Sequence, residues 1–204
     1  MASRASNEYI RFVRKSRQEQ RLVGEGVELR RHDRSNYPLY ARWYGDEEVW
    51  RLTSWASEPM QQAAVERLFE DRKESPMNNS FAIHREGEEE PIGVISLMNI
   101  SEVDASADLS VIVGEKEDRD EGSGTEAIRL ILRYAFEDLG LSRVALSVFQ
   151  FNDPAMRSYE KLGFRREGRI ERAVHRDGEW QDAILMRILA SEWREEEDTG
   201  EAPS

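Results

Sequence analysis

A glycine-rich loop at Arg119–Thr125, with the sequence Arg-Asp-Glu-Gly-Ser-Gly-Thr, directly precedes a stretch with helical periodicity. In that stretch apolar residues recur at spacings of three and four from Ile128 to Leu139, which predicts one apolar helix face. A helix N-terminus offers unpaired N–H groups and a partial positive charge, and glycines let an anion approach the backbone closely. We therefore expect the loop to hold a phosphate, or the pyrophosphate of a nucleotide cofactor.

Other interpretations of this loop are open from its residues alone. Gly122-x-Gly124-x-x-Ala127 formally fits the dinucleotide fingerprint, but there the glycines follow a strand directly, whereas here eight residues, Gly114 to Glu121, intervene. An ATP-type phosphate loop requires a Gly-Lys-Ser/Thr sequence, and this loop has no lysine. A glycine turn without a ligand is the remaining alternative.

A second pattern, Asn152-x-x-Ala155-x-x-x-Tyr159-x-Lys161-x-Gly163, follows 28 residues after Gly124.

The chain has no cysteine, which excludes thiolate nucleophiles, disulfides and cysteine-ligated metals. The three histidines lack the spacing of metal ligands, so we expect no metal site. No serine nucleophile elbow is visible, which argues against covalent catalysis.

These motifs require a framework of strands and helices, and the chain predicts both. Alternating apolar residues, hairpin turns and an Asp-Gly turn at Asp177 indicate strands, while cap residues and prolines indicate helix starts. The expected strands are 27–31, 81–84, 92–99, 109–113, 144–149, 164–174 and 180–189; the expected helices are 35–43, 46–52, about 57–73, 125–139 and a short one from 152 or 153. Several hairpins and only one or two helical crossovers favour the α+β class.

Length and charge set the remaining limits. The chain has 204 residues, which predicts one domain, 25–190, between a basic extension (1–24) and an acidic, mobile tail (191–204). The net charge of −12 disfavours nucleic acid and anionic membranes as partners, and we expect a cytoplasmic protein because neither a membrane span nor a secretory signal is visible. We expect the extension either to pack on the domain, to mediate a homodimer, or to fray.

In combination, the loop and the second pattern resemble the GNAT superfamily of acyl-CoA-dependent N-acyltransferases. Arg42–Val49 (Arg-Trp-Tyr-Gly-Asp-Glu-Glu-Val) and Arg176–Asp182 (Arg-Asp-Gly-Glu-Trp-Gln-Asp) resemble early and late segments of the branch with ribosomal-protein N-terminal, spermidine and some aminoglycoside acetyltransferases. The resemblance covers about residues 25–190. It implies a GNAT fold, in which six to seven mostly antiparallel strands, flanked by about four helices, contain two splayed central strands.

The resemblance also implies acetyl-CoA as cosubstrate, bound in the cleft between the splayed strands. Its pantetheine arm would pair with the backbone, and its pyrophosphate with N–H groups and an arginine. The implied backbone contacts to the arm are Val111, Ile112 and Val113, and those to the pyrophosphate are Glu121, Gly122, Ser123, Gly124 and Thr125, with the Arg119 side chain. Asn152 would hydrogen-bond the arm, Ala155 would leave room for it, and Arg157 or Lys161 would reach the 3′-phosphate.

The reaction that the resemblance implies is direct attack of a neutral amine on the thioester. Tyr159 matches the family's tyrosine and is the candidate donor to the leaving thiolate; Asp108 is the candidate base, with Glu102 and Asp104 as alternatives. The acceptor would be a small-molecule amine or a protein N-terminus. The resemblance places the acceptor beside the aromatic residues around Trp43, Trp50 and Trp55, for which core packing is an equal alternative.

Two other functions stay open at this stage. One is a non-catalytic acyl-CoA-binding or regulatory module on the same fold, against which the presence of both Tyr159 and the glycine loop argues. The other is a nucleotide-binding oxidoreductase, which the position of the glycine loop disfavours.

Overall fold

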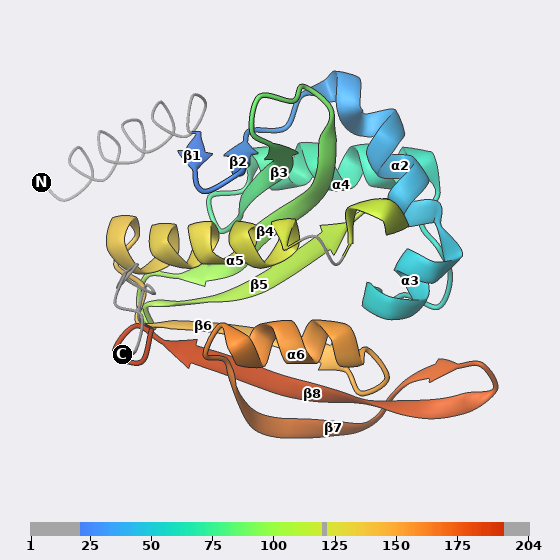
Figure 1. The fold of residues 1–204 in the computed structure, drawn as a ribbon. Helices are drawn as coiled ribbons and strands as arrows, with labels where there is room; N and C mark the ends of the chain where they lie inside the picture. Colours follow the sequence, from blue (N-terminus) through green and yellow to red (C-terminus); the bar gives the residue numbers. More distant parts are fainter. Residues whose placement is uncertain (1–20, 120–121, 194–204) are drawn as a thin grey trace, which may run out of the picture.

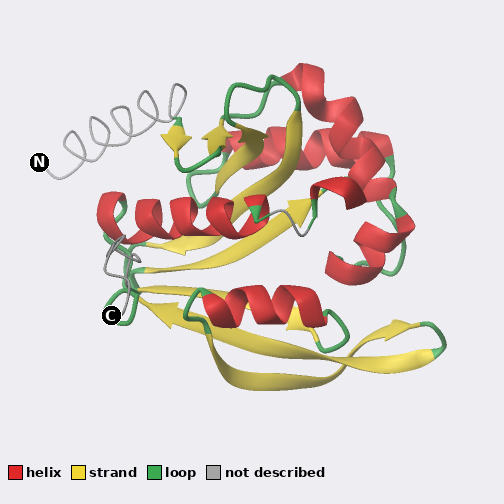
Figure 2. Ribbon diagram, viewed as in Figure 1, coloured by secondary structure: helices red, strands yellow, loops and turns green. Residues whose placement is uncertain are grey.

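The computed structural model describes residues 21–119 and 122–193, which form one twisted sheet with helices on both faces (Figures 1 and 2). The strands are β1 (Leu22–Val23), β2 (Val27–Arg30), β3 (Asn79–Arg85), β4 (Pro91–Ser101), β5 (Ser106–Val113), β6 (Arg143–Phe149), β7 (Arg165–Arg176) and β8 (Glu179–Leu189). The α-helices are α2 (Tyr37–Gly45), α3 (Glu47–Thr53), α4 (Gln62–Glu74), α5 (Ser123–Arg133) and α6 (Asp153–Lys161). Short 3-10 turns cover Arg34–Asn36 and Lys116–Asp118, and a π-helical turn, Tyr134–Asp138, continues α5.

The strands form one sheet in the order β1-β2-β3-β4-β5-β6-β8-β7. Every neighbouring pair is antiparallel except β5 and β6, which run parallel because α5 connects them. The α+β class and the mostly antiparallel sheet are confirmed. The described residues contain eight strands rather than six to seven, because β1 is too short to leave a sequence pattern, and five α-helices rather than about four.

Two hydrophobic clusters hold the helices on the sheet. The larger lies on the face covered by α5 and α6 and includes Ile131 from α5, Met156 from α6 and Leu146 from β6. The smaller lies on the opposite face, where α2 and α4 pack Tyr40 and Phe69 against the sheet. The sheet is therefore covered on both faces, and its middle is buried.

The helix expected from Ser57 instead begins at Gln62, as α4. Ser57 and Pro59 resemble a helix start, but the segment between α3 and α4 is irregular, with a bend at residues 56–58, and is held by distant partners. The N–H of Met60 donates to the Tyr44 carbonyl at 3.0 Å. The other partners of this segment come from β6 and β7, and a sequence pattern over a few residues does not contain them.

Packing among the described residues reaches slightly beyond the predicted domain limits. Leu22 and Val23 pair with β2, and the Trp193 ring lies 5.6 Å from the Phe136 ring. Most of the predicted basic extension and acidic tail lies outside the described residues, so the three-part division stays a prediction. No helix among the described residues is long and apolar enough to cross a membrane.

Candidate active site

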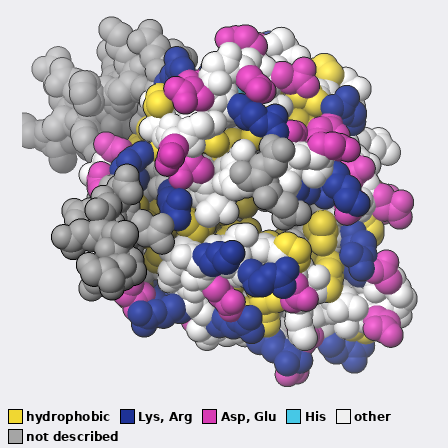
Figure 3. Space-filling view, viewed as in Figure 1, with side chains coloured by type: hydrophobic (Ala, Val, Ile, Leu, Met, Phe, Trp, Pro, Cys, Tyr) yellow, Lys and Arg dark blue, Asp and Glu magenta, His cyan; other side chains and the backbone are white. Residues whose placement is uncertain are grey.

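The parallel strands β5 and β6 pair along only part of their length and then separate. Their register joins Ser106 to Arg143 and ends at Asp108 and Ala145, after which β5 continues to Val113 and β6 to Phe149 without pairing. Beyond Asp108, the edge of β5 that faces β6 is therefore open for hydrogen bonding. The space-filling view is hollowed here, with hydrophobic side chains in the hollow and Lys and Arg side chains on its lower rim (Figure 3).

The N-terminus of α5 lies at the open end of β5. Gly122 occupies its N-cap position with φ 86°, and no side chain among the described residues caps the helix. The first helical bond runs from the Glu126 N–H to the Gly122 carbonyl at 3.0 Å, and the preceding three N–H groups, of Ser123, Gly124 and Thr125, have no acceptor among the described residues.

The first turn of α5 also packs directly against β5. A Cβ on Gly124 would lie 3.2 Å from Cγ2 of Val113, so a larger side chain at this position would push the turn away from the strand. The helix therefore presents uncapped donors beside the gap, which is an arrangement suited to an anion. Glu121 lies outside the described residues.

Arg119 is positioned by the chain itself. Its Nε and Nη2 donate to the carbonyls of Val113 (3.3 Å) and Gly114 (2.8 Å), and Nη1 lies 3.2 Å from a carboxylate oxygen of Glu48. These contacts tie the loop before α5 to the end of β5 and to α3. Its contact with a pyrophosphate stays a prediction.

Helix α6 forms the other side of the gap. Asn152 caps it: Oδ1 accepts from the Ala155 N–H and Nδ2 donates to the Leu52 carbonyl, both at 3.3 Å. The predicted bond from Asn152 to the cofactor arm would add to these two. Arg157 and Lys161 lie four residues apart on α6, are exposed and form no ion pair within the described residues, so both are available to a phosphate.

Tyr159 lies on α6 and packs partly buried against the larger cluster, with its ring 5.8 Å from that of Phe164. Its hydroxyl makes no hydrogen bond to a described residue. Burial raises the pKa of Tyr159 to about 12, because the phenolate would be poorly solvated. At neutral pH the side chain is therefore a neutral phenol with a free donor.

Asp108 lies at the point where the two strands separate. Its strand neighbours Ala107 and Leu109 are buried on the α5 and α6 face, so the exposed Asp108 side chain projects from the opposite face. Its Oδ2 accepts from Nδ2 of Asn99 at 2.9 Å. The two predicted catalytic residues thus belong to opposite faces of the sheet, with the opening between them. The alternatives Glu102 and Asp104 are exposed in the turn before β5.

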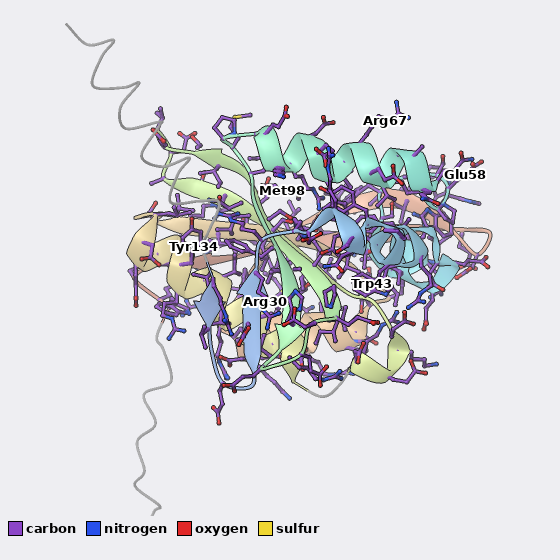
Figure 4. The ribbon with its side chains drawn as sticks, turned by 90° about the horizontal axis from the view of Figure 1, so that it is seen from above. Arg30, Trp43, Glu58, Arg67, Met98 and Tyr134 are labelled. Atoms are coloured by element: carbon purple, nitrogen blue, oxygen red, sulfur yellow. The ribbon has the colours of Figure 1, made fainter. Side chains whose placement is uncertain are left out.

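The aromatic residues of the first helices divide into two groups. Tyr40 and Trp43 are core residues, and Trp43, labelled in Figure 4, packs so closely on Gly114 that a Cβ there would lie 2.1 Å from the indole. Trp55, in contrast, is half exposed, and its ring lies 5.3 Å from that of Phe149 at the open end of β6. Of these three residues, only Trp55 is exposed enough to contact an acceptor.

A separate depression of about 490 Å³ lies at the other end of the sheet, lined by Arg30, His84 and Glu89 among others. Arg30 pairs there with Glu28 and Glu89, so the charges of this depression largely satisfy one another. Among the described residues no three His, Cys, Asp or Glu side chains are grouped to hold a metal ion.

Sequence reasoning missed two residues of this region, Glu48 and Arg176. Glu48 holds Arg119, and Arg176 holds the segment after α3. The Arg176-Asp177-Gly178 sequence predicts a turn, but a turn motif does not show what its arginine contacts.

The chain is similar to known acetyltransferases in sequence and in fold. A model of the acetyltransferase (GNAT) domain matches residues 27–165. The spermidine N(1)-acetyltransferase of Escherichia coli K12 is 29% identical over 147 residues, 71% of this chain and 77% of that protein. The N-acetyltransferase 9-like protein of Caenorhabditis briggsae is 29% identical over 159 residues, 72% and 78% of the two chains. The structure of the Vibrio cholerae spermidine N-acetyltransferase in complex with CoA and spermine superposes with a TM-score of 0.76 at 22% identity. The superposition covers 83% of this chain and 98% of that one.

Proposed function

Since the chain belongs to the acetyltransferase (GNAT) domain family and is an acetyl-CoA-dependent N-acetyltransferase, we propose that it acetylates a primary amine by direct attack in the gap between β5 and β6. The observation that carries the proposal is the partial pairing of these strands. It ends at Asp108 and leaves β5 unpaired with β6 up to Val113, where the N-terminus of α5 packs. A flat, fully paired sheet would leave no room for a thioester between its strands.

The residues present fit acetyl-CoA. The N–H groups of Ser123, Gly124 and Thr125, which have no acceptor among the described residues, would hold the pyrophosphate. The edge of Val111–Val113, whose Val113 carbonyl also accepts from Arg119, would pair with the pantetheine arm. Arg157 or Lys161 would bind the 3′-phosphate, since both are exposed and form no ion pair within the described residues. These local donors matter because the chain as a whole is acidic and repels a polyanion at long range.

Tyr159 would act by hydrogen bonding rather than by complete proton transfer. Acetyl-CoA supplies an activated acetyl group, and CoA leaves as a thiolate whose conjugate thiol has a pKa of about 8.5. With the pKa of Tyr159 at about 12, full transfer of its proton would cost about 5 kcal/mol. A hydrogen bond from the neutral phenol to the thiolate has no such cost and strengthens as charge develops on the sulfur.

Asp108 is our candidate for accepting the amine proton. An amine with a pKa near 10 is mostly protonated at neutral pH and must lose a proton before it attacks. Asp108 projects at the start of the gap from the face opposite α6, so an amine approaching from that face would meet its carboxylate, directly or through water. The chain would further contribute proximity by holding both reactants in one gap.

For the acceptor we propose a small-molecule primary amine. The named activity of the E. coli and V. cholerae relatives on spermidine supports this class, and a protein N-terminus is the alternative acceptor. The negative charge of this chain favours the approach of cationic amines in general.

Two measurements test the proposal. Acetyl-CoA should raise the melting temperature of the protein whereas NAD should not, since ligands that bind only the folded state stabilise it. Thiol release from acetyl-CoA should then be measured with spermidine, an aminoglycoside and a peptide with a free N-terminus. Stabilisation without thiol release from any amine would favour the non-catalytic module, and stabilisation by NAD alone would reject the acetyl-CoA site.

A further inference from the structure

The tip of the β7–β8 hairpin holds the segment that follows α3. Nη2 of Arg176 donates to the carbonyls of Ser54 (2.7 Å) and Ala56 (3.1 Å), and Nη1 donates to the His175 carbonyl (2.9 Å). The guanidinium also lies 4.0 Å from the centre of the Trp50 ring. One side chain thus contacts the Trp50 ring of α3 and binds two carbonyls of the irregular segment that follows this helix.

Arg176 is unusual because it is buried without a carboxylate partner. It is 4% exposed, its Nε has no hydrogen-bond partner among the described residues, and its bonded acceptors are all neutral carbonyls. Burial lowers the pKa of Arg176, with only the neighbouring Asp177 opposing the shift. Burying a cation without a counter-ion usually lowers stability, so the position of the Arg176 side chain needs an explanation other than stability.

Helix α3 and the segment after it, which Arg176 holds, contact the elements on both sides of the gap. On the β5 side, Glu48 of α3 binds Arg119 at 3.2 Å. On the β6 side, Leu52 accepts from Asn152, and the Trp55 ring contacts Phe149. Helix α3 and the residues after it therefore extend from one separated strand to the other, and the ribbon shows α3 beside this end (Figure 1).

We propose that Arg176 is a positioning residue for the acceptor: it fixes residues 50–56 across the open end of the gap and so sets the space in which the amine binds. This inference rests on the proposed function, because it takes the gap to be the site of acetyl transfer. Arg176 itself contacts backbone and Trp50 rather than the reacting atoms. An exposed ion pair beside it, Arg51 with Asp177 at 2.6 Å, would contribute little, since exposed pairs are weak.

The test uses the full chain with Arg176→Met and Arg176→Lys, and Arg172→Ala as the matched control. Methionine keeps the length and the apolar contact with Trp50 but binds no carbonyl, and it removes the buried charge, so the variant is expected to fold. Arg172 lies in the same strand, with its guanidinium over the Trp180 ring at 5.1 Å, and touches neither Ser54 nor Ala56.

Hydrogen exchange and kinetics are then measured. For Arg176→Met we expect amides of residues 53–58 to exchange at least about tenfold faster, while those of α5 are unchanged. The KM for the amine of the panel that gives the fastest thiol release should rise about tenfold, and the Kd of acetyl-CoA should stay within about twofold. Arg176→Lys should fall between, and Arg172→Ala should match the unmodified chain. Unchanged exchange, or equal weakening of acetyl-CoA and amine binding, would overturn the inference. Absence of amine acetylation by the unmodified chain would reject the proposed function, while exchange would still decide the role of Arg176.

Discussion

Replacing Tyr159 with phenylalanine removes one oxygen atom whose loss can be followed separately in folding and in catalysis. The hydroxyl has no hydrogen-bond partner among the described residues, so we expect the free energy of unfolding at pH 7 to change by less than about 0.5 kcal/mol. If the hydroxyl donates to the leaving thiolate, its loss should cost about 1.5–3 kcal/mol of transition-state stabilisation, the range for hydrogen bonds to charged groups. That corresponds to a fall in kcat of roughly 10- to 150-fold.

The assay is thiol release with a saturating amine, combined with calorimetric titration of acetyl-CoA. The Kd of acetyl-CoA should stay within about twofold, because the hydrogen bond forms only as the thiolate develops. Tyr134→Phe is the matched control: Tyr134 is also buried, but it packs against Phe81 and away from the gap. Equal losses in kcat and in acetyl-CoA affinity, or a clear loss of stability, would refute the assignment and make Tyr159 a packing residue.

The same variant has a distinct pH signature. Folding raises the pKa of Tyr159 from 10 to about 12, so the folded state holds this proton more tightly than the unfolded state. The corresponding stability, at most about 2.7 kcal/mol, is complete below pH 10 and is lost as the pH rises to 12. Denaturant unfolding should therefore show a smaller alkaline loss for Tyr159→Phe than for the unmodified chain, and identical alkaline slopes would argue against burial of the phenol.

Three further predictions follow from single residues. Gly122→Val should weaken acetyl-CoA binding by at least about tenfold in calorimetry. The control is Gly140→Val, at a similarly positive φ at the other end of the helix, which should lower the unfolding free energy by the backbone strain of about 1–2 kcal/mol and leave acetyl-CoA affinity unchanged. Equal acetyl-CoA affinities of the two variants would show that the loop is only a turn. Burial lowers the pKa of His32 to about 3, so the stability present above pH 6.5 should be lost on acidification at up to about 1.4 kcal/mol per pH unit. Urea unfolding at pH 7, 6 and 5 should show that the unfolding free energy of His32→Gln falls less steeply with decreasing pH than that of the unmodified chain. Parallel pH dependences would contradict the burial of His32. Asn152→Ala should lower the unfolding free energy by about 1 kcal/mol through the lost cap of α6, and an unchanged value would show that the cap contributes nothing.

Most of the framework could be predicted because its signals are local. Alternation in β6, the apolar face of α5 and the Asp177-Gly178 turn, where both residues have positive φ, are all carried by neighbouring residues. β1 was missed because a two-residue strand has no period, and it forms only by pairing with β2. The start of α4 was wrong because Arg176, about 120 residues away in the chain, takes the carbonyls of the preceding segment.

The candidate site was predicted unevenly for the same reason. The glycine loop and Tyr159 could be named because each belongs to a short motif. The separation of β5 from β6 leaves no mark on either strand, since Leu109 and Leu146 alternate as they would in a fully paired sheet. The partners of Arg119 and Asn152 come from α3 and could not be read from either motif.

The most direct test of the account is an amide NMR titration of the full chain with acetyl-CoA. We predict that the N–H signals of Ser123, Gly124 and Thr125 shift most, because these uncapped groups receive the pyrophosphate, and that signals from Val111 to Val113 shift with them. Saturating acetyl-CoA that leaves these signals in place, or that instead moves those around Arg30 and His84, would contradict the assignment of the site.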